Sequence, residues 1–228
     1  MKKLMTTSSM ILTAAALIMA ACLVGCTESP KEKAAGPKKE GAVSAAKQSV
    51  GKASEKFQTA LKKAQEGDPK SMGEVGGMYL DGKEVEKDPM LAIEWLTKAS
   101  EKGNEWAEFG LGRIYKEGMG VPQDYAKALI WFKKSAARGN QASQLAIADM
   151  LLKGEGVKKD VEQALQMMRR LADEGYVWAQ SSLGTIYADG VYVPKNTKEA
   201  VKWLQKAAQQ DNEAARKWAQ AKLKELGE

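Results

Sequence analysis

The sequence contains no histidine, and its only two cysteines, Cys22 and Cys26, lie near the N-terminus. The absence of histidine removes the commonest general base and metal ligand, together with every Ser/His or Cys/His catalytic pair. Cysteines placed so early cannot supply a disulfide, a zinc cluster or a thiol nucleophile to the body of the chain. These absences argue against most classes of enzyme.

Motifs for phosphate, dinucleotide or metal binding are also lacking. The Ser-x-x-Lys spacing occurs at Ser44 and Ser49, but no Lys-Thr-Gly motif accompanies it, so we attribute the spacing to chance. A site built from carboxylates alone stays open, because Asp and Glu are plentiful. We expect no enzyme activity, no catalytic residue, no metal, no cofactor and no small-molecule substrate.

The N-terminus has the features of a secretory signal. Lys2 and Lys3 precede the apolar stretch Met10–Gly25. That stretch is shorter than the roughly 20 residues that span a bilayer, so residues 1–25 are expected to be a signal peptide.

The signal ends in Leu23-Val24-Gly25-Cys26, which resembles the lipobox of bacterial lipoproteins. The resemblance implies that Cys26 is lipidated and becomes the first residue of the mature chain, with two or more acyl chains for stable anchoring. Thr27 follows in place of Asp, which by the same resemblance suggests an outer-membrane protein facing the periplasm. The alternative is an ordinary secretory peptide with an incidental cysteine.

Residues 26–54 have linker composition, rich in Lys, Glu, Gly, Pro and Ala, and we expect a flexible tether. The formal charge of +6 falls to about +1 once Lys2, Lys3 and the tether are set aside. The basic pI therefore belongs to the N-terminal segments, and no nucleic-acid partner is expected. An apolar stripe that includes Phe57, Ala60 and Ala64 predicts an N-terminal capping helix within residues 55–68.

The rest of the chain repeats with a period of 36 residues, in four units at 69–104, 105–140, 141–176 and 177–212. Equivalent positions carry the same kind of residue, as in the column Gly76, Gly112, Ala148 and Gly184. A second column predicts helix N-caps: Asp88, Asp124, Asp160 and Asn196. A third, Gly103, Gly139 and Gly175, predicts left-handed residues after a helix.

Each unit is therefore expected to hold a helix A of about 13 residues, a glycine-containing loop and a helix B of about 15 residues. Asn104, Asn140 and Asn212 cap the helix that follows each of them. A glycine inside a helix is costly, so the Gly76 column predicts close contact between helices. Trp95, Trp131 and Trp203 are expected in the core.

The pattern from Ala107 through Leu111-Gly112, Tyr115, Gly118 and Asp124 to Trp131 resembles the Sel-one-like repeat family, a relative of the tetratricopeptide repeat. The resemblance implies an all-α fold, an α/α superhelical solenoid of four helix-turn-helix repeats, with a C-terminal capping helix in residues 213–228. It also implies a binding scaffold, although the partner does not follow from the fold.

In tetratricopeptide-like arrays, the second, fifth, ninth and twelfth residues of helix A line a concave groove. By this resemblance the partner-binding residues are Trp106, Phe109, Arg113, Lys116, Leu145, Asp149 and Trp178. An alternative places Trp106 and Trp178 in the joint between adjacent repeats.

Two functions are compatible with these features. The first is a lipid-anchored periplasmic adaptor that binds a protein or peptide in its groove. The second is an assembly subunit of an envelope complex, such as polysaccharide export or flagellar machinery, which docks through its convex or terminal surfaces.

Overall fold

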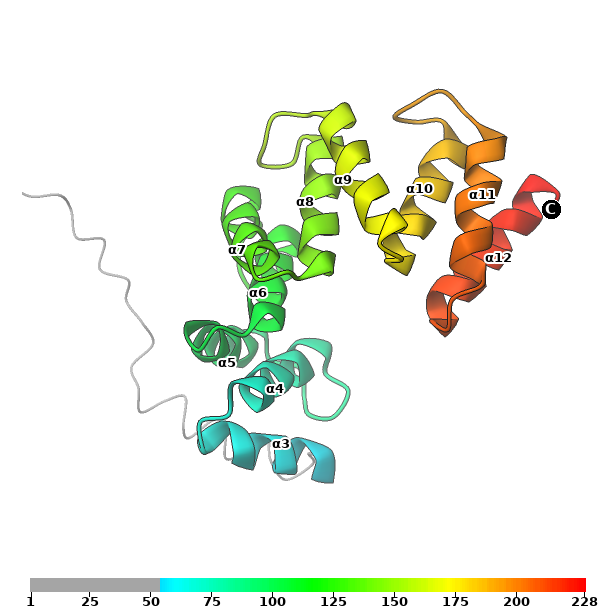
Figure 1. Cartoon of the computed structure of the whole chain (residues 1–228). Coiled ribbons are helices and arrows are strands. Elements are labelled where there is room, and N and C mark those ends of the chain that lie inside the picture. Colours follow the sequence, from blue (N-terminus) through cyan, green and yellow to red (C-terminus); the bar gives the residue numbers. More distant parts are fainter. Residues whose placement is uncertain (1–53) are drawn as a thin grey trace, which may run out of the picture. The chain divides into compact units, whose positions relative to one another are not determined.

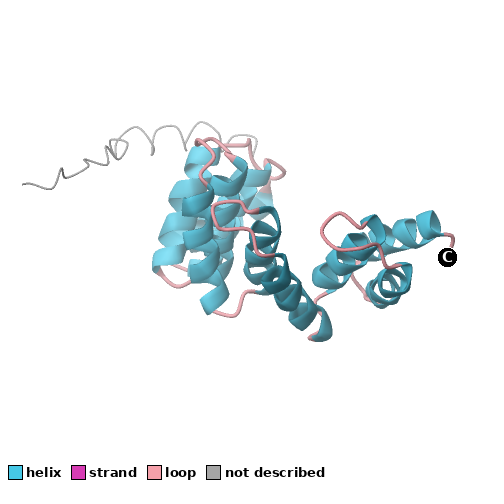
Figure 2. Ribbon diagram, turned by 90° about the horizontal axis from the view of Figure 1, so that it is seen from above, coloured by secondary structure: helices cyan, strands magenta, loops and turns pink. Residues whose placement is uncertain are grey.

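The computed structural model describes residues 54–228, all of which belong to the compact unit Val43–Glu228. The predicted signal peptide, Cys26 and most of the tether lie outside the described residues. Within residues 54–228 the secondary structure is entirely α-helical (Figures 1 and 2). The helices are α3 (Glu55–Gln65), α4 (Pro69–Asp81), α5 (Pro89–Glu101), α6 (Glu105–Glu117), α7 (Tyr125–Ala137), α8 (Gln141–Lys153), α9 (Val161–Asp173), α10 (Val177–Asp189), α11 (Thr197–Ala208) and α12 (Glu213–Leu226).

The helices pack as four successive pairs, α4–α5, α6–α7, α8–α9 and α10–α11, and each pair contacts the next. Figure 1 shows this order as a progression of colours along the array. The helix α3 packs on α4, and α12 packs on α11 and α10. The predicted all-α solenoid of four repeats is confirmed.

The predicted helix ends are confirmed by their hydrogen bonds. The carboxylate of Asp124 accepts the backbone N–H of Lys127 at the start of α7, and Asp88, Asp160 and Asn196 cap α5, α9 and α11 in the same way. At the other end Gly103 takes a φ of 83°, in the left-handed region. The helices B are 12 or 13 residues long and not 15. The residues just before the closing glycine form a turn with hydrogen bonds three residues apart, as from Lys102 N–H to the Ala99 carbonyl, so the α-helix ends earlier.

The glycines inside helix A allow the close helix contact that the sequence predicted. A Cβ on Gly112 would lie 2.5 Å from two ring carbons of Phe132 in α7. The third repeat has Ala148 at the equivalent position, and α8 and α9 pack less closely than the other pairs. The repeat register is nevertheless kept, because α8 and α9 begin at the caps Asn140 and Asp160.

A buried carboxylate links α6 to α7. Glu108 is fully buried, and its carboxylate lies 3.2 Å from both the Lys134 Nζ and the Arg138 Nε. Lys134 is itself exposed, but its ammonium neutralises a charge that has no access to water.

We therefore expect Lys134→Leu to destabilise the fold by about 1–3 kcal/mol, the cost of leaving a buried polar group short of a partner. Thermal unfolding of Lys134→Leu beside Lys133→Leu, an exposed neighbour, measures the effect. Equal melting temperatures for the two variants would contradict this role for Lys134.

The three tryptophans predicted in the core differ in burial. Trp203 is buried, with 4% of its surface exposed, and its indole N–H donates to Glu199 Oε2. Trp95 and Trp131 are only half-buried, and the ammonium groups of Lys98 and Lys134 lie 4.7 Å and 5.1 Å from their ring centroids. The prediction is confirmed for Trp203 only. The other two pack one face on the core and turn the other toward a lysine.

None of the helices in residues 54–228 has the length and apolar character needed to cross a bilayer.

Candidate functional site

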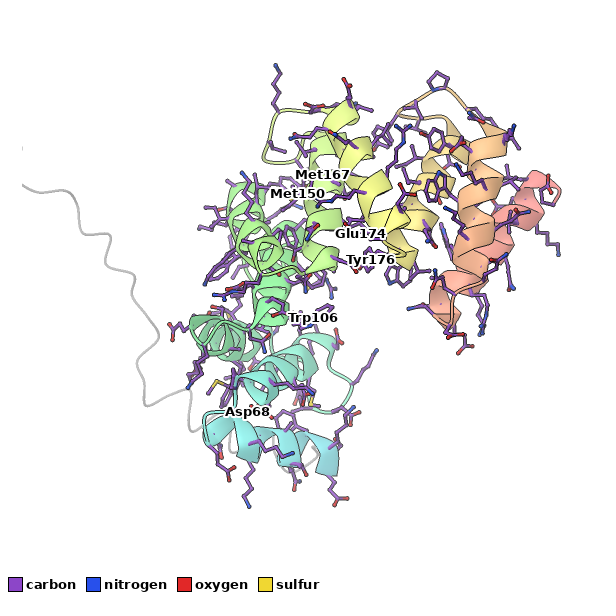
Figure 3. The ribbon with its side chains drawn as sticks, in the orientation of Figure 1. Asp68, Trp106, Met150, Met167, Glu174 and Tyr176 are labelled. Atoms are coloured by element: carbon purple, nitrogen blue, oxygen red, sulfur yellow. The ribbon has the colours of Figure 1, made fainter. Side chains whose placement is uncertain are left out.

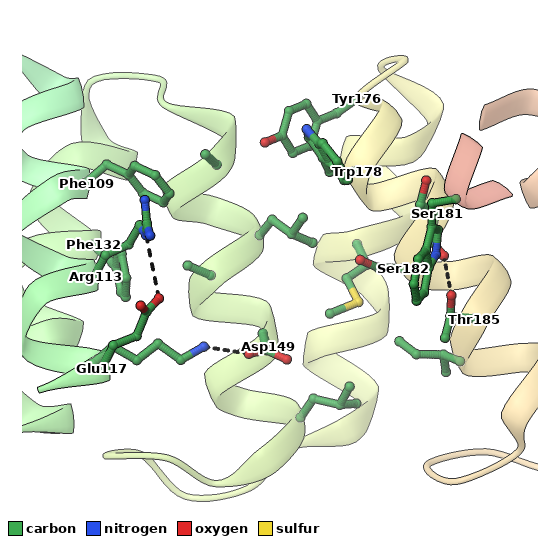
Figure 4. Close-up of a pocket in the computed structure, with 18 of the residues that line it drawn as sticks. Phe109, Arg113, Glu117, Phe132, Asp149, Tyr176, Trp178, Ser181, Ser182 and Thr185 are labelled. Atoms are coloured by element: carbon green, nitrogen blue, oxygen red, sulfur yellow. Dashed lines mark hydrogen bonds and ion pairs between the residues drawn. The ribbon is translucent and has the colours of Figure 1, made fainter. Parts of the chain in front are cut away.

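A cavity of about 870 Å³ opens along α6, α8 and α10, with Trp218 of α12 also in its lining. We call it the groove pocket; Figure 4 shows most of its residues. It brings together all the residues that the sequence predicted for partner binding: Trp106, Phe109, Arg113, Lys116, Leu145, Asp149 and Trp178. These residues come from three repeats, so the pocket exists only because the repeats stack.

An aromatic series ties the mouth of the pocket to the core. The ring of Trp106 meets that of Phe109 edge-on, with centroids 6.2 Å apart, and Phe109 lies 5.8 Å from Phe132. Trp106 is 62% exposed and Trp178 is 39% exposed. Side chains that filled the joint between repeats would be buried, so the structure favours the groove position for both tryptophans.

The charged groups of the pocket are paired with one another. Lys116 Nζ lies 2.7 Å from Asp149 Oδ2, and Arg113 Nε lies 3.6 Å from Glu117 Oε1 (Figure 4). Burial alone would raise the pKa of Asp149, but hydrogen bonds from Lys116 and Lys153 outweigh it and lower that pKa. The chain itself thus supplies the counter-charges of this lining.

The lowered pKa of Asp149 predicts a pH dependence of stability. A carboxyl group with a depressed folded-state pKa stabilises the fold above its unfolded pKa, and this contribution is lost as the pH falls through the folded-state pKa. At neutral pH we expect Asp149→Asn to lower the melting temperature by about 2–4 °C, taking roughly 1 kcal/mol for a partly buried ion pair. The difference between variant and wild type should shrink as the pH falls through the lowered pKa of Asp149 and vanish once its carboxyl group is protonated in the folded protein. A difference independent of pH would contradict the ion-pair account.

Tyr176 lines the pocket but was not predicted from the sequence. It stands where Asn104, Asn140 and Asn212 cap their helices, and it makes no side-chain cap on α10. Its backbone angles match those of the asparagines, with φ −68° and ψ 106°. Burial raises the pKa of its phenol above the usual range. The replacement of asparagine by tyrosine at this repeat position could have pointed to Tyr176 from the sequence, because it removes a helix cap and places an aromatic ring in the pocket.

We expect Tyr176→Asn to be more stable than Tyr176→Ala by about 1 kcal/mol, because asparagine restores the missing cap on a backbone already shaped for it. Chemical denaturation of the two variants measures this difference. Equal stabilities would show that the backbone here does not accept a cap.

Three further lining residues, Ser181, Tyr192 and Trp218, also come from different elements. Ser181 is the fifth residue of its helix A, so it belongs to the groove column, but it was not among the residues predicted to bind a partner. Tyr192 lies in the loop between α10 and α11, whose path the repeat pattern does not specify. Trp218 lies in the terminal half-repeat, which was read only as a cap. Among the described residues no group of three or more Cys, Asp or Glu is placed to hold a metal ion.

The fold and this pocket define a class: an all-α helical-repeat protein with an apolar pocket on the helix A side of its array. The Sel1 repeat family model matches residues 69–104, 107–140, 141–176 and 179–212. The chain therefore belongs to the Sel1 repeat family, whose members are commonly protein-interaction scaffolds and are generally not enzymes.

Solved structures agree with this assignment. The chain is 37% identical to a protective antigen of uropathogenic Escherichia coli with an SLR fold, at a TM-score of 0.58 over 70% of this chain and 34% of that one. It is 31% identical to a Sel1 repeat protein from Oxalobacter formigenes, at 0.61 over 70% and 63%. A Sel1 repeat protein from Klebsiella pneumoniae, 22% identical at 0.59 over 72% and 78%, shows the fold alone. The chain thus spans about a third of the first relative and under two thirds of the second. Among curated proteins none matches.

Proposed function

We propose that this protein is an adaptor that binds a segment of another protein in the groove pocket. The observation that carries the proposal is the pocket itself, which is largely apolar, about 870 Å³ in volume and lined from three repeats. Exposed tryptophans at its mouth are the residue type most enriched at binding hot spots. Membership of the Sel1 repeat family, whose members are commonly interaction scaffolds, supports the same function.

The second candidate, an assembly subunit that docks through its convex surface, rests on Met90 and Ile130. Both are exposed apolar residues on helices B. They lie singly on different helices, and single exposed apolar residues are normal on a protein surface. The groove pocket is therefore the better-supported binding surface.

Capture of partners from solubilised membranes tests the choice between these surfaces. The bait is the full chain, compared with Trp106→Ala in the pocket and Ile130→Ala on the convex face, the matched apolar control. A partner lost only from Trp106→Ala supports the adaptor. A partner lost only from Ile130→Ala supports the assembly subunit.

We also propose that the protein is anchored through lipidated Cys26 and faces the periplasm from the outer membrane. The support is the Leu23–Cys26 lipobox after an apolar signal, with Thr27 in place of Asp. Two or more acyl chains would hold the protein stably at a bilayer.

We expect Cys26→Ala to be released from the membrane in soluble form or to keep its signal peptide uncleaved. Membrane fractionation with a carbonate wash, followed by mass spectrometry of the N-terminus, measures both outcomes. Wild type and variant that partition equally and share one N-terminal mass would refute the anchor.

A further inference from the structure

The tryptophans on helices A and on helices B differ in what covers their rings. Trp95, Trp131 and Trp203 each have a lysine ammonium over the ring, at 4.7, 5.1 and 4.4 Å from the centroid. Within residues 54–228 no such cation lies over Trp106 or Trp178, the two tryptophans of the predicted groove column. Trp218, which also lines the pocket, has the Lys222 ammonium 6.0 Å from its ring centroid. Trp106 and Trp178 therefore differ from the helix B tryptophans and from Trp218 in having no cation over their rings.

The pocket also contains hydrogen-bonding groups that lack partners. In the described part of the chain the indole N–H groups of Trp106 and Trp178 have no acceptor, unlike that of Trp203. The Ser181 hydroxyl, in a residue only 3% exposed, lines the pocket with no hydrogen-bond partner. The two indole N–H groups are therefore available to donate to an occupant of the pocket.

A second, smaller cavity of about 500 Å³ continues from the groove pocket, since Trp106, Ala142 and Tyr176 line both. Trp106 and Tyr176 are marked in Figure 3. Asn140, 5% exposed, lines this second cavity, and its Nδ2 donor has no acceptor. In the preceding repeat the equivalent Asn104 donates to the Pro69 carbonyl at 2.8 Å. In the next repeat the corresponding carbonyl is that of Glu105, and it accepts a hydrogen bond from the Ser135 hydroxyl. The Asn140 amide does not bond to it.

The occupant that suits this lining is uncharged, apolar and rich in hydrogen-bond acceptors. It is uncharged because Arg113 and Lys116 already have acidic partners within the chain. A helix would offer few acceptors, since its carbonyls are used internally. An extended chain keeps its carbonyls free, and a polyproline II segment does so in a conformation that is already ordered, which reduces the entropy lost on binding.

We propose that the groove pocket binds a proline-rich segment of its partner in the polyproline II conformation. Proline rings pack on Trp106 and Trp178, and backbone carbonyls accept from the two indole N–H groups. Aromatic-lined grooves with free donors are the general means of recognising such segments. This inference rests on the proposed adaptor function and names the chemistry of its partner.

Two synthetic peptides test the proposal. The first is a blocked peptide of about twelve residues with the repeat Pro-Pro-Leu, which favours polyproline II. The second has the repeat Ala-Ala-Leu, with similar apolar character but a helical preference. Titration calorimetry with the full chain in detergent measures binding to wild type, Trp106→Ala, Trp178→Ala and the convex control Ile130→Ala.

We expect the proline peptide to bind wild type at least about tenfold more tightly than the alanine peptide, with a loss of tenfold or more in each tryptophan variant and none in Ile130→Ala. Tighter binding of the alanine peptide, binding indifferent to Trp106 and Trp178, or no binding of the proline peptide would overturn the proposal. A competition experiment distinguishes failure of this proposal from failure of the adaptor function. If a partner binds through Trp106 but the proline peptide does not displace it, the adaptor function holds and only the proline-rich segment is refuted.

Discussion

Gly112→Leu should lower the free energy of unfolding by about 3 kcal/mol and the melting temperature by roughly 6–12 °C. The reason is steric: even a Cβ at this position would lie 2.5 Å from the ring of Phe132. Phe132 is buried, so it can yield only by disturbing the contact between α6 and α7. Leucine's better helix propensity returns about 1 kcal/mol at most, which does not offset the clash. Thermal and chemical unfolding measure the loss.

The array supplies a matched control within α4. Gly76 and Gly77 are neighbours, and a Cβ on Gly76 would lie 2.6 Å from Leu96 Cγ, whereas a Cβ on Gly77 would meet nothing within 4 Å. Gly76→Leu should therefore destabilise the protein as Gly112→Leu does, while Gly77→Leu should be neutral or stabilising by up to about 1 kcal/mol. If Gly76→Leu and Gly77→Leu unfold alike, the assignment of the helix contact is wrong.

Trp106→Ala should weaken partner binding by at least about 2 kcal/mol, which is roughly thirtyfold in the dissociation constant. Trp106 is 62% exposed in the free protein, so its removal costs little stability. In a complex its ring would be buried against the partner while still braced by Phe109, and truncation would lose that contact. Affinity for the captured partner, with a melting curve for each variant, measures the effect.

Phe109→Ala separates the direct contact from its support. Phe109 lies between Trp106 and Phe132, so its loss should weaken binding and lower stability together. If binding is unchanged in Trp106→Ala but abolished in Ile130→Ala, the partner binds the convex face and not the groove pocket.

The fold could be predicted from the sequence alone because each repeat contains residues that mark where its helices begin, end and touch. The Asp124 column marks where helices B begin, the Gly103 column marks where they end, and the Gly112 column gives the contact between helices. These features act within one repeat, and four copies of the pattern remove chance as an explanation. The lengths of helices B were overestimated, because the closing turn has the same composition as the helix.

The site was predicted only in part, and Tyr176 shows the physical reason. Residues on helix A follow a regular spacing, so the seven predicted side chains fall in one pocket. Tyr176 precedes its helix and Tyr192 lies in a loop, where no periodicity applies. The ion pair of Lys134 with Glu108 was not predicted either, because Glu108 lies 26 positions earlier in the sequence and meets Lys134 only after α6 and α7 pack.

Binding of partners on the pocket side of the array can be followed through the chain's own tryptophans. Trp106 and Trp178 line the groove pocket, whereas Trp95 and Trp131 are half-buried on helices B and Trp203 is buried. The indole N–H signals in a nuclear magnetic resonance spectrum, assigned by single Trp→Phe variants and followed during titration with the captured partner, report on each ring separately. We predict that the signals of Trp106 and Trp178 shift or broaden, while those of Trp95, Trp131 and Trp203 stay in place. Movement of the Trp95 and Trp131 signals, with Trp106 and Trp178 unchanged, would contradict the account.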